Sequence, residues 1–414
     1  MASSGFVTQS SNPTIQHEME KKLMDLMENS NLNEIEALIS RGVNINCTDR
    51  EGLTPLLQLV KLGQARNDLL DVIRLLLDQN GIDVNCKDSD EWNALYYLCR
   101  LYQKADLIDI ILLLIQRGIK VDWTNKSRQN AFLFLCQHYP HKNMIDIVQI
   151  FIDNNIDIGC TNSNGWNALH HLCRNYKQSN LVDVFRLLVE HGMDITCNTR
   201  VGWNALHILC HEKTQDNHMD LIKLFINLGI DVNSKNKGGW NALHILCQNY
   251  QKDNLIDIVR LFINHGVDVN CSDDDERNVL HILCGRYTEE NLVDLVQLLI
   301  DHGIDVNSKN GGGWNFLCRN YKKGNLIDIV RLFINNGIDV KCINDGGWNV
   351  LHILCKNCSN LSNLVEIVEL LVENGIDVDC KTQHGKGLNA FKIFCNDNAN
   401  AKLYNKLKLL LQKK

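Results

Sequence analysis

The feature of this chain that most limits its possible folds is an eight-residue phrase that recurs along nearly its whole length. The phrase W-N-A-L-H-I-L-C occupies residues 203–210 and again residues 240–247. The equivalent positions are Leu53, Trp92, Gln129, Trp166, Trp203, Trp240, Arg277, Trp314, Trp348 and Leu388, most of them 37 residues apart. A fixed period in this range indicates a stacked array of small repeated units. Such an array offers a long binding surface more readily than one deep catalytic pocket.

The interval between two phrases has the pattern of two helices. Asn241 stands directly before an apolar run, and asparagine favours the N-cap of a helix. After a short polar break, Asn254 begins a second apolar segment, with Asp257 at the spacing of a capping box. Gly266 ends that segment as a C′ residue. We therefore predict a helix, a loop, a second helix and an extended turn in each unit.

These residues resemble the ankyrin repeat, whose unit starts its first helix with T-P-L-H-x-A-A and closes with G-A-D-V-N. The matching residues are Asn241, Ala242, Leu243, His244, Leu246 and Cys247 at the helix start, and Val259, Leu261, Phe262, Ile263, Gly266, Asp268, Val269 and Asn270 in the second half. The unit at residues 53–85 is nearest to the family pattern and keeps Thr54, Pro55 and Leu56. The family unit has about 33 residues, so we place the four extra residues between the two helices.

The resemblance covers roughly residues 16–414 and implies an all-α ankyrin-repeat solenoid, with helix-loop-helix-turn units stacked in an elongated curved array. We expect a disordered N-terminal lead at residues 1–15, an N-terminal capping repeat at 16–50, the repeat array at 51–386 and a C-terminal capping repeat at 387–414. This makes about eleven units including caps. Terminal repeats must face water on one side, so the polar composition of both caps fits a complete solenoid.

Composition excludes several classes of function. The net charge of −7 and the lack of clustered basic residues argue against a nucleic-acid partner. No apolar run approaches the roughly 20 residues that span a bilayer, and no secretory signal is present. The 17 cysteines recur mainly at two positions of the repeat, as small buried hydrophobes do. Their odd number and the absence of a secretory signal predict a reducing compartment, either the cytoplasm or the nucleus. We also expect the protein to be a monomer.

Histidine and cysteine recur three residues apart in five units, at His170/Cys173, His207/Cys210, His244/Cys247, His281/Cys284 and His352/Cys355. This spacing could pair two metal ligands on one helix face. However, the histidine matches the T-P-L-H position, which the family resemblance implies is a structural hydrogen-bonding residue directed at neighbouring turns. No unit gains a catalytic set that its siblings lack. We expect no catalytic residue, no metal and no cofactor.

Two features are candidates for partner binding. The recurring tryptophan lies beside the turn, where the rings either pack on the next repeat or form an exposed ladder for a partner. An acidic turn tip, S-D-D-D-E, precedes position 277. The predicted partner-binding residues are Trp166, Trp203, Trp240, Asp273, Asp274, Asp275, Glu276 and Arg277.

Asparagines that close the D-V-N phrase form a further set of candidates. In ankyrin proteins an asparagine at this place is sometimes a substrate of an asparaginyl hydroxylase. The resemblance therefore makes Asn85, Asn233, Asn270 and Asn307 candidate hydroxylation sites. The alternative is a structural role in which each asparagine holds its turn.

The function that these patterns predict is a non-enzymatic scaffold or adaptor, which binds protein partners through turn tips and through a concave surface of first helices. One alternative is a substrate-receptor subunit in protein degradation, which we disfavour because no appended box follows the last predicted helix. The other is a duplicated structural or host-directed array without a single tuned partner, since the units at Trp240 and Trp314 are nearly alike.

One unit has a deletion that predicts a weak joint. Residues 314–318 read W-N-F-L-C, three residues short of the sibling units. The loss of nearly one helical turn should shorten the first helix and remove its packing near Asn315. Amide hydrogen exchange is expected to be faster in this unit than in the unit at Trp240, and equal protection of the two units would contradict the prediction.

Overall fold

The computed structural model describes residues 13–28, 32–212, 218–252, 254–308, 321, 323–344, 346–357, 362–383, 387–397, 405–406 and 408–410. The chain forms two compact units, Met1–Arg200 and Val201–Lys414. All regular elements in the described residues are helices, apart from one isolated bridge between Thr124 and Asn130. The predicted all-α repeat fold is therefore confirmed.

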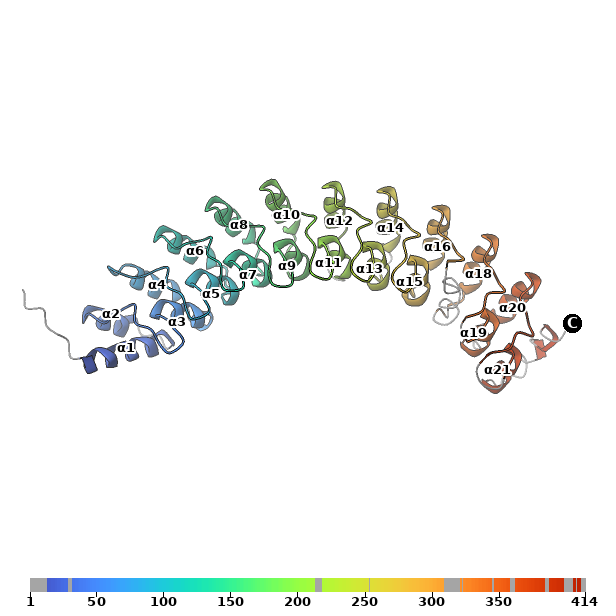
Figure 1. Ribbon diagram of the computed structural model, residues 1–414, viewed down its shortest axis with the longest axis horizontal. Helices are drawn as coiled ribbons and strands as arrows, with labels where there is room; N and C mark the ends of the chain where they lie inside the picture. Colours follow the sequence, from blue (N-terminus) through green and yellow to red (C-terminus); the bar gives the residue numbers. More distant parts are fainter. Residues whose placement is uncertain are drawn as a thin grey trace, which may run out of the picture. The chain divides into compact units, whose positions relative to one another are not determined.

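The first unit consists of two rows of helices, which are labelled in Figure 1. The first helices of its repeats are α1 (Pro13–Glu28), α3 (Pro55–Leu62), α5 (Ala94–Leu101), α7 (Ala131–His138) and α9 (Ala168–Asn175). The second helices are α2 (Leu32–Ser40), α4 (Leu69–Leu77), α6 (Leu107–Gln116), α8 (Met144–Asp153) and α10 (Leu181–Glu190), and the short 3-10 helix η1 (Gly63–Ala65) follows α3. Helices of the same row pack against each other in consecutive repeats, as α5 does against α7 and α6 against α8.

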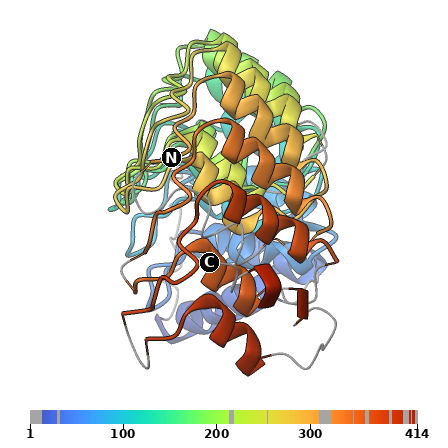
Figure 2. The same cartoon turned by 90° about the vertical axis from the view of Figure 1, so that its right-hand side faces the viewer.

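The second unit repeats this arrangement. Its first helices are α11 (Ala205–His211), α13 (Ala242–Asn249), α15 (Val279–Arg286), α19 (Val350–Asn357) and α21 (Ala390–Asp397). Its second helices are α12 (His218–Asn227), α14 (Leu255–Asn264), α16 (Leu292–Asp301), α18 (Leu326–Asn335) and α20 (Leu364–Glu373). Figure 2 shows the orange and red second helices of this unit side by side with their axes aligned. None of the described helices has the length and apolar character needed to cross a bilayer.

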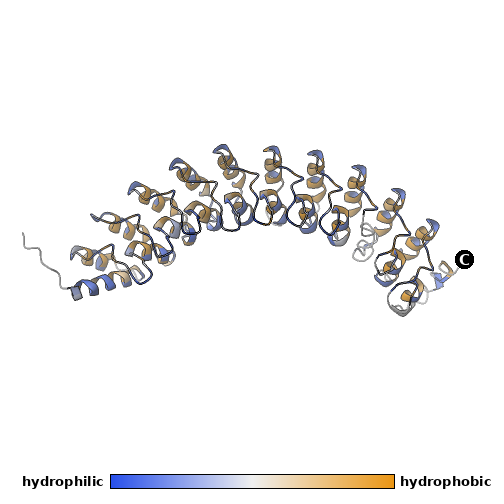
Figure 3. Cartoon of the chain, in the orientation of Figure 1, coloured by the Kyte–Doolittle hydropathy of each residue, from blue (hydrophilic) through white to orange (hydrophobic). Residues whose placement is uncertain are grey.

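Apolar side chains between neighbouring repeats form the core. Leu95 and Leu98 of α5 and Ile110 and Leu114 of α6 have no exposed surface. In Figure 3 the hydrophobic colour covers the helix faces that turn toward other helices, and the polar colour covers the loops. Burial of one such side chain contributes about 1.5–3 kcal/mol, so most of the stability of each repeat comes from its neighbours.

The first helix α13 begins as predicted. The Asn241 side chain accepts a hydrogen bond from the backbone N–H of His244 at 3.1 Å and so caps α13. Gly266 has a φ of +77° directly after α14 and is the predicted C′ residue. The predicted capping box of α14 is wrong, because Asn254 makes no side-chain cap bond. Its Oδ1 instead accepts from the hydroxyl of Tyr250 at 2.8 Å.

This tyrosine–asparagine pair explains the extra residues between the two helices. In the first unit the hydroxyl of Tyr176 lies 2.9 Å from Asn180 Oδ1 and 2.9 Å from the carbonyl oxygen of His141 in the preceding repeat. Asn180 Nδ2 donates to the carbonyl oxygen of Lys142 at 2.7 Å. The same pair or its aspartate version occurs at Tyr102–Asp106, Tyr139–Asn143, Tyr176–Asn180, Tyr250–Asn254, Tyr287–Asn291 and Tyr321–Asn325. We call it the interhelix clasp. In the copies at Tyr139, Tyr176, Tyr287 and Tyr321 the hydroxyl also reaches a carbonyl oxygen of the preceding linker.

Some predictions fall partly or wholly outside the described residues. Trp314 and Asn315 lie outside them, so the weak joint stays a prediction. Helix α1 begins at Pro13, before residue 16, at which we expected the capping repeat to start. Proline is well suited to the first turn of a helix, because its missing N–H would have no partner there. The other boundaries between lead, array and caps stay predictions.

We predict that Asn180→Ala weakens the contact between the repeats of α8 and α10. The substitution leaves the carbonyl of Lys142 without its amide donor and the hydroxyl of Tyr176 without one acceptor. The expected loss is about 1–2 kcal/mol in the free energy of local opening, measured by hydrogen exchange over α9 and α10. The matched control is Ser179→Ala, an exposed position in the same linker. Equal exchange in the two variants would show that the clasp does not stabilise the stack.

Candidate protein-binding surface

The turn before each first helix is closed by one polar side chain. In the second unit Asn236 Oδ1 accepts from the backbone N–H groups of Gly238 at 2.9 Å and Trp240 at 3.0 Å. Gly239 has a φ of +76°, and a Cβ there would lie 2.9 Å from the backbone nitrogen of Asp274. The turn therefore needs glycine at this position, and it holds Trp240 at its base.

The recurring tryptophans are half-buried, and each ring packs mainly on its own first helix. The side chains of Trp92, Trp166, Trp203, Trp240 and Trp348 are all partly exposed. The ring of Trp240 lies 5.9 Å from that of His244, and the pair Trp348 and His352 has a separation of 5.8 Å. The packing therefore involves the tryptophan's own repeat more than the next one, and it leaves part of each indole open to solvent.

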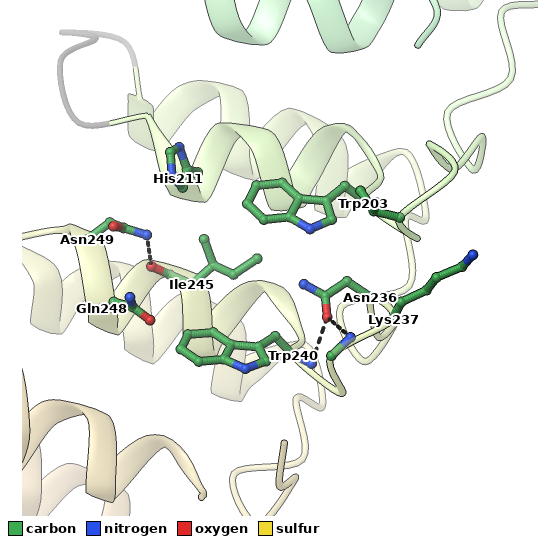
Figure 4. Close-up of a pocket in the computed structure, with 10 residues that line it drawn as sticks. Trp203, His211, Asn236, Lys237, Trp240, Ile245, Gln248 and Asn249 are labelled. Carbon is green, nitrogen blue, oxygen red and sulfur yellow. Dashed lines mark hydrogen bonds between the residues drawn. The ribbon is translucent and has the colours of Figure 1, made fainter. Parts of the chain in front are cut away.

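A hollow of about 410 Å³ separates two of these indoles in the second unit. Figure 4 shows Trp203 and Trp240 on either side of it, with Ile245 pointing between them. Val201, which is 56% exposed, and Lys237 line the side next to the turns. The hollow has apolar walls and a polar rim, which is the usual composition of a site for an apolar side chain.

The acidic tip divides into one buried residue and three exposed ones. Asp273 is only 5% exposed, and its Oδ1 accepts from the N–H groups of Asp275 at 3.0 Å and Arg277 at 2.8 Å. It thus has the same turn-closing role as Asn236. Asp274, Asp275 and Glu276 are exposed. A role of Asp273 in binding would be indirect, through the turn that it closes.

Arg277 connects this tip to the tryptophan hollow. Its guanidinium pairs with Asp273 at 2.8 Å and with Asp275 at 2.7 Å. The same group lies 5.7 Å from the ring centroid of Trp240. The structure therefore brings Trp240, Arg277 and the tip together, as part of one surface with Trp203. Trp166 belongs to the first unit.

At His207 and His352 the repeated histidine connects two repeats. His207 Nδ1 accepts from the backbone N–H of Asn204 at 3.3 Å, and Nε2 lies 3.2 Å from the carbonyl oxygen of Trp240. A carbonyl oxygen only accepts, so Nε2 carries the proton. Burial lowers the pKa of His207, which keeps the ring neutral. The histidine bonds the neighbouring turn, as the family resemblance implied. The described residues contain no group of three or more metal-ligating side chains.

Comparison with protein families agrees with this architecture. A family model described as ankyrin repeats (3 copies) matches residues 23–125, 133–216, 211–310 and 287–382. The chain belongs to the ankyrin-repeat family. A search of curated proteins finds no match to it. The recognition made from the repeated phrase is therefore confirmed over most of the chain.

The ankyrin array holds one set of its cysteines away from solvent. Cys247 has no exposed surface, and Cys99, Cys136 and Cys284 are each 1% exposed. Burial raises the pKa of these thiols. Because the thiolate is the nucleophile and the metal ligand, these residues serve as small core side chains. Ankyrin repeats are typically non-enzymatic, and these thiols offer no reactive group.

The D-V-N asparagines bridge successive repeats of the array. Asn270 Nδ2 donates to the carbonyl oxygen of Gly303 at 2.8 Å, and its Oδ1 accepts from the N–H of Asp305 at 2.7 Å. The same pair of bonds occurs at Asn85, Asn233 and Asn307. These side chains hold the following turn. Their hydroxylation stays a prediction.

One repeat carries a buried histidine where several siblings carry isoleucine. His171 is 5% exposed and occupies the place of Ile208 and Ile245. Burial is the main cause that lowers the pKa of His171 to about 3, and the nearby His170, His138 and Arg174 lower it further. The folded array therefore holds this ring neutral at physiological pH.

We predict that His171 makes the first unit sensitive to acid. Its pKa is lower in the folded state than its ordinary value of 6.5. The unfolded state therefore binds the additional proton, and stability is lost as the pH falls from 6.5 toward 3. Between pH 7 and pH 5 the parent should lose up to about 2 kcal/mol more stability than His171→Ile. The measurement is urea unfolding at both pH values.

The control for this experiment is His191→Asn, which removes an exposed histidine at the end of α10. It should keep the pH dependence of the parent. An unchanged dependence in His171→Ile would show that another group causes the loss of stability in acid.

Proposed function

We propose that this ankyrin-repeat protein is a non-enzymatic adaptor or scaffold, which binds a protein partner through turn tips and first helices of its second unit. Ankyrin repeats are generally protein–protein interaction modules. The single observation that carries the proposal is the hollow between Trp203 and Trp240. Its walls form a rigid apolar surface at the base of two exposed turns, where a side chain of the partner could pack.

The geometry of the hollow supports tight packing of one apolar side chain. The Trp240 ring is held against His244, and Ile245 is only 2% exposed at the base. A tryptophan side chain loses little conformational entropy on binding, and a ring that is already fixed by packing loses even less. The entropic cost of ordering the site is therefore low. Tryptophans of this kind are enriched among the residues that dominate binding energy.

Charged groups on the two sides of the hollow differ in sign. Lys237 lies at the turn between the two indoles, whereas Asp274, Asp275 and Glu276 form the exposed tip that follows. A partner with an apolar anchor and a basic flank on the side of the acidic tip would match this arrangement. Such charge patterns set the orientation and the association rate more than the affinity.

We further propose that the protein acts as a monomer in a reducing compartment, the cytoplasm or also the nucleus. The cysteines Cys99, Cys136, Cys247 and Cys284 are free and buried. Free thiols at many positions suit a compartment in which disulfides are rare. The net charge of −7 favours a protein partner over a nucleic acid.

The test is capture of the partner by a photo-crosslinking residue placed in the hollow. Gln248 lines the hollow, and Arg260 is exposed on the second helix α14 of the same repeat. We expect the crosslinker at position 248 to capture one protein from a native lysate at high yield. The crosslinker at position 260 should capture much less of it.

A second pair of variants separates binding from folding. Trp203→Ala combined with Trp240→Ala should abolish the capture, whereas Trp123→Ala, at a half-buried tryptophan outside the series, should leave it intact. Circular dichroism must show equal helix content in all variants. Equal crosslinking at positions 248 and 260 would refute the proposed site. Capture of ubiquitin-ligase components would favour the degradation receptor, and the absence of any specific partner would favour the duplicated array.

A further inference from the structure

A second hollow, of about 510 Å³, lies in the first unit between the first helices α5 and α7. Its walls include Trp92, Arg100, Phe134 and His138, and the exposed Lys126 lies at its rim. It has the same place in its repeats as the Trp203–Trp240 hollow but a different chemistry. Two of these five side chains, Arg100 and Lys126, are positively charged, since burial and the nearby Arg100 lower the pKa of His138. Arg100 lies against aromatic rings.

Arg100 lies close to aromatic side chains from two repeats. Its guanidinium carbon lies 4.4 Å from the ring centroid of Trp92 and 5.8 Å from that of Phe134. The ring of Tyr96 lies 3.9 Å from that of Trp92, and its hydroxyl accepts from Asn125 Nδ2 at 2.9 Å. These rings limit the positions open to the guanidinium, and the Arg100 side chain remains partly exposed. Within residues 32–212, all of which are described, Arg100 has no hydrogen bond or ion pair.

The same arrangement recurs two repeats later. Arg174 follows Trp166 by eight residues, as Arg100 follows Trp92, and its guanidinium lies 5.4 Å from the ring centroid of Trp166. Arg174 is exposed, and it too forms no ion pair within residues 32–212. The repeat between them has Gln129 and Gln137 at the two positions. The first unit thus presents two guanidinium groups, each close to a tryptophan ring. The two groups are two repeats apart.

We propose that this face of the first unit binds an extended acidic segment of a partner protein, with one carboxylate on Arg100 and another on Arg174. The planar guanidinium fork matches a carboxylate in bidentate geometry. The exposed Lys126 and Arg128 between the two sites add positive charge.

The spacing of the two arginines predicts the spacing of the acidic residues. Neighbouring packed helices lie about 8–10 Å apart, so two steps along the row span roughly 16–20 Å. An extended peptide rises about 3.3 Å per residue. The two carboxylates should therefore stand about five to six residues apart in the partner.

The observations favour an acidic peptide over a nucleic acid. A phosphate backbone needs a continuous basic strip, whereas these guanidinium groups are separated by a repeat with glutamines at the equivalent positions. This inference concerns the first unit and does not depend on the proposed role of Trp203 and Trp240.

The experiment measures binding of fluorescein-labelled glycine–serine peptides to the full chain by fluorescence anisotropy at low salt. Each peptide carries two glutamates, whose separation varies from about two to about nine residues. We expect the tightest binding at a separation of about five to six. Arg100→Gln and Arg174→Gln should each weaken it about tenfold, and the double variant should remove the dependence on spacing. Arg100→Lys should have an intermediate effect, because it keeps the charge but loses the fork.

The control is the double variant Arg74→Gln/Arg186→Gln, which removes two exposed arginines from second helices and changes the net charge equally. It should bind like the parent, and so should Trp203→Ala/Trp240→Ala. The inference is overturned if the parent does not bind, if spacing has no effect, or if the control loses as much affinity as the double variant. It is also overturned if a single-stranded oligonucleotide binds more tightly than the best peptide and requires the same arginines.

Discussion

The burial of apolar helix faces between consecutive repeats is the interaction on which the rest of this structure depends. The helices from α2 onward are mostly 8–10 residues long, and helices of that length are marginal in isolation. Their stability comes from neighbours in the stack. Polar bridges then set the register between repeats. The interhelix clasp joins the linkers, the D-V-N asparagines join the turns after the second helices, and His207 joins its first helix to the next turn.

These same constraints determine which side chains are left for a partner. Several of the described turns are closed by an asparagine or an aspartate, such as Asn236 or Asp273, whose side chain is used within the turn. The indoles are held on their own first helices and keep one part open to solvent. Their surroundings then differ between the two units. The first unit places a stacked arginine beside Trp92, and the second places an apolar hollow and an acidic tip beside Trp240.

Local sequence patterns predicted most of the elements, because their causes are local. Asn241 caps its helix and Gly266 ends the next one, as we predicted, since both roles depend on backbone geometry within a few residues. The prediction of a capping box at Asn254 was wrong, because the side-chain oxygen of Asn254 accepts a hydrogen bond from Tyr250 in the linker. Tyrosine stands ten residues after the first position of the repeated phrase in five units, at Tyr102, Tyr139, Tyr176, Tyr250 and Tyr287. This recurrence was the signal that could have revealed the clasp.

The sequence by itself determined the repeat period, the all-α class, the ankyrin family, the cap of α13 at Asn241 and the end of α14 at Gly266. These follow from periodicity and from capping, which operate over short distances along the chain. Only the tertiary structure decided that Asp273 is buried, that the indoles are half-covered and that Arg100 lies between Trp92 and Phe134. Each of these outcomes depends on a contact with a residue folded against the turn or one repeat away. Nearly identical phrases therefore acquire different surfaces when their neighbours differ.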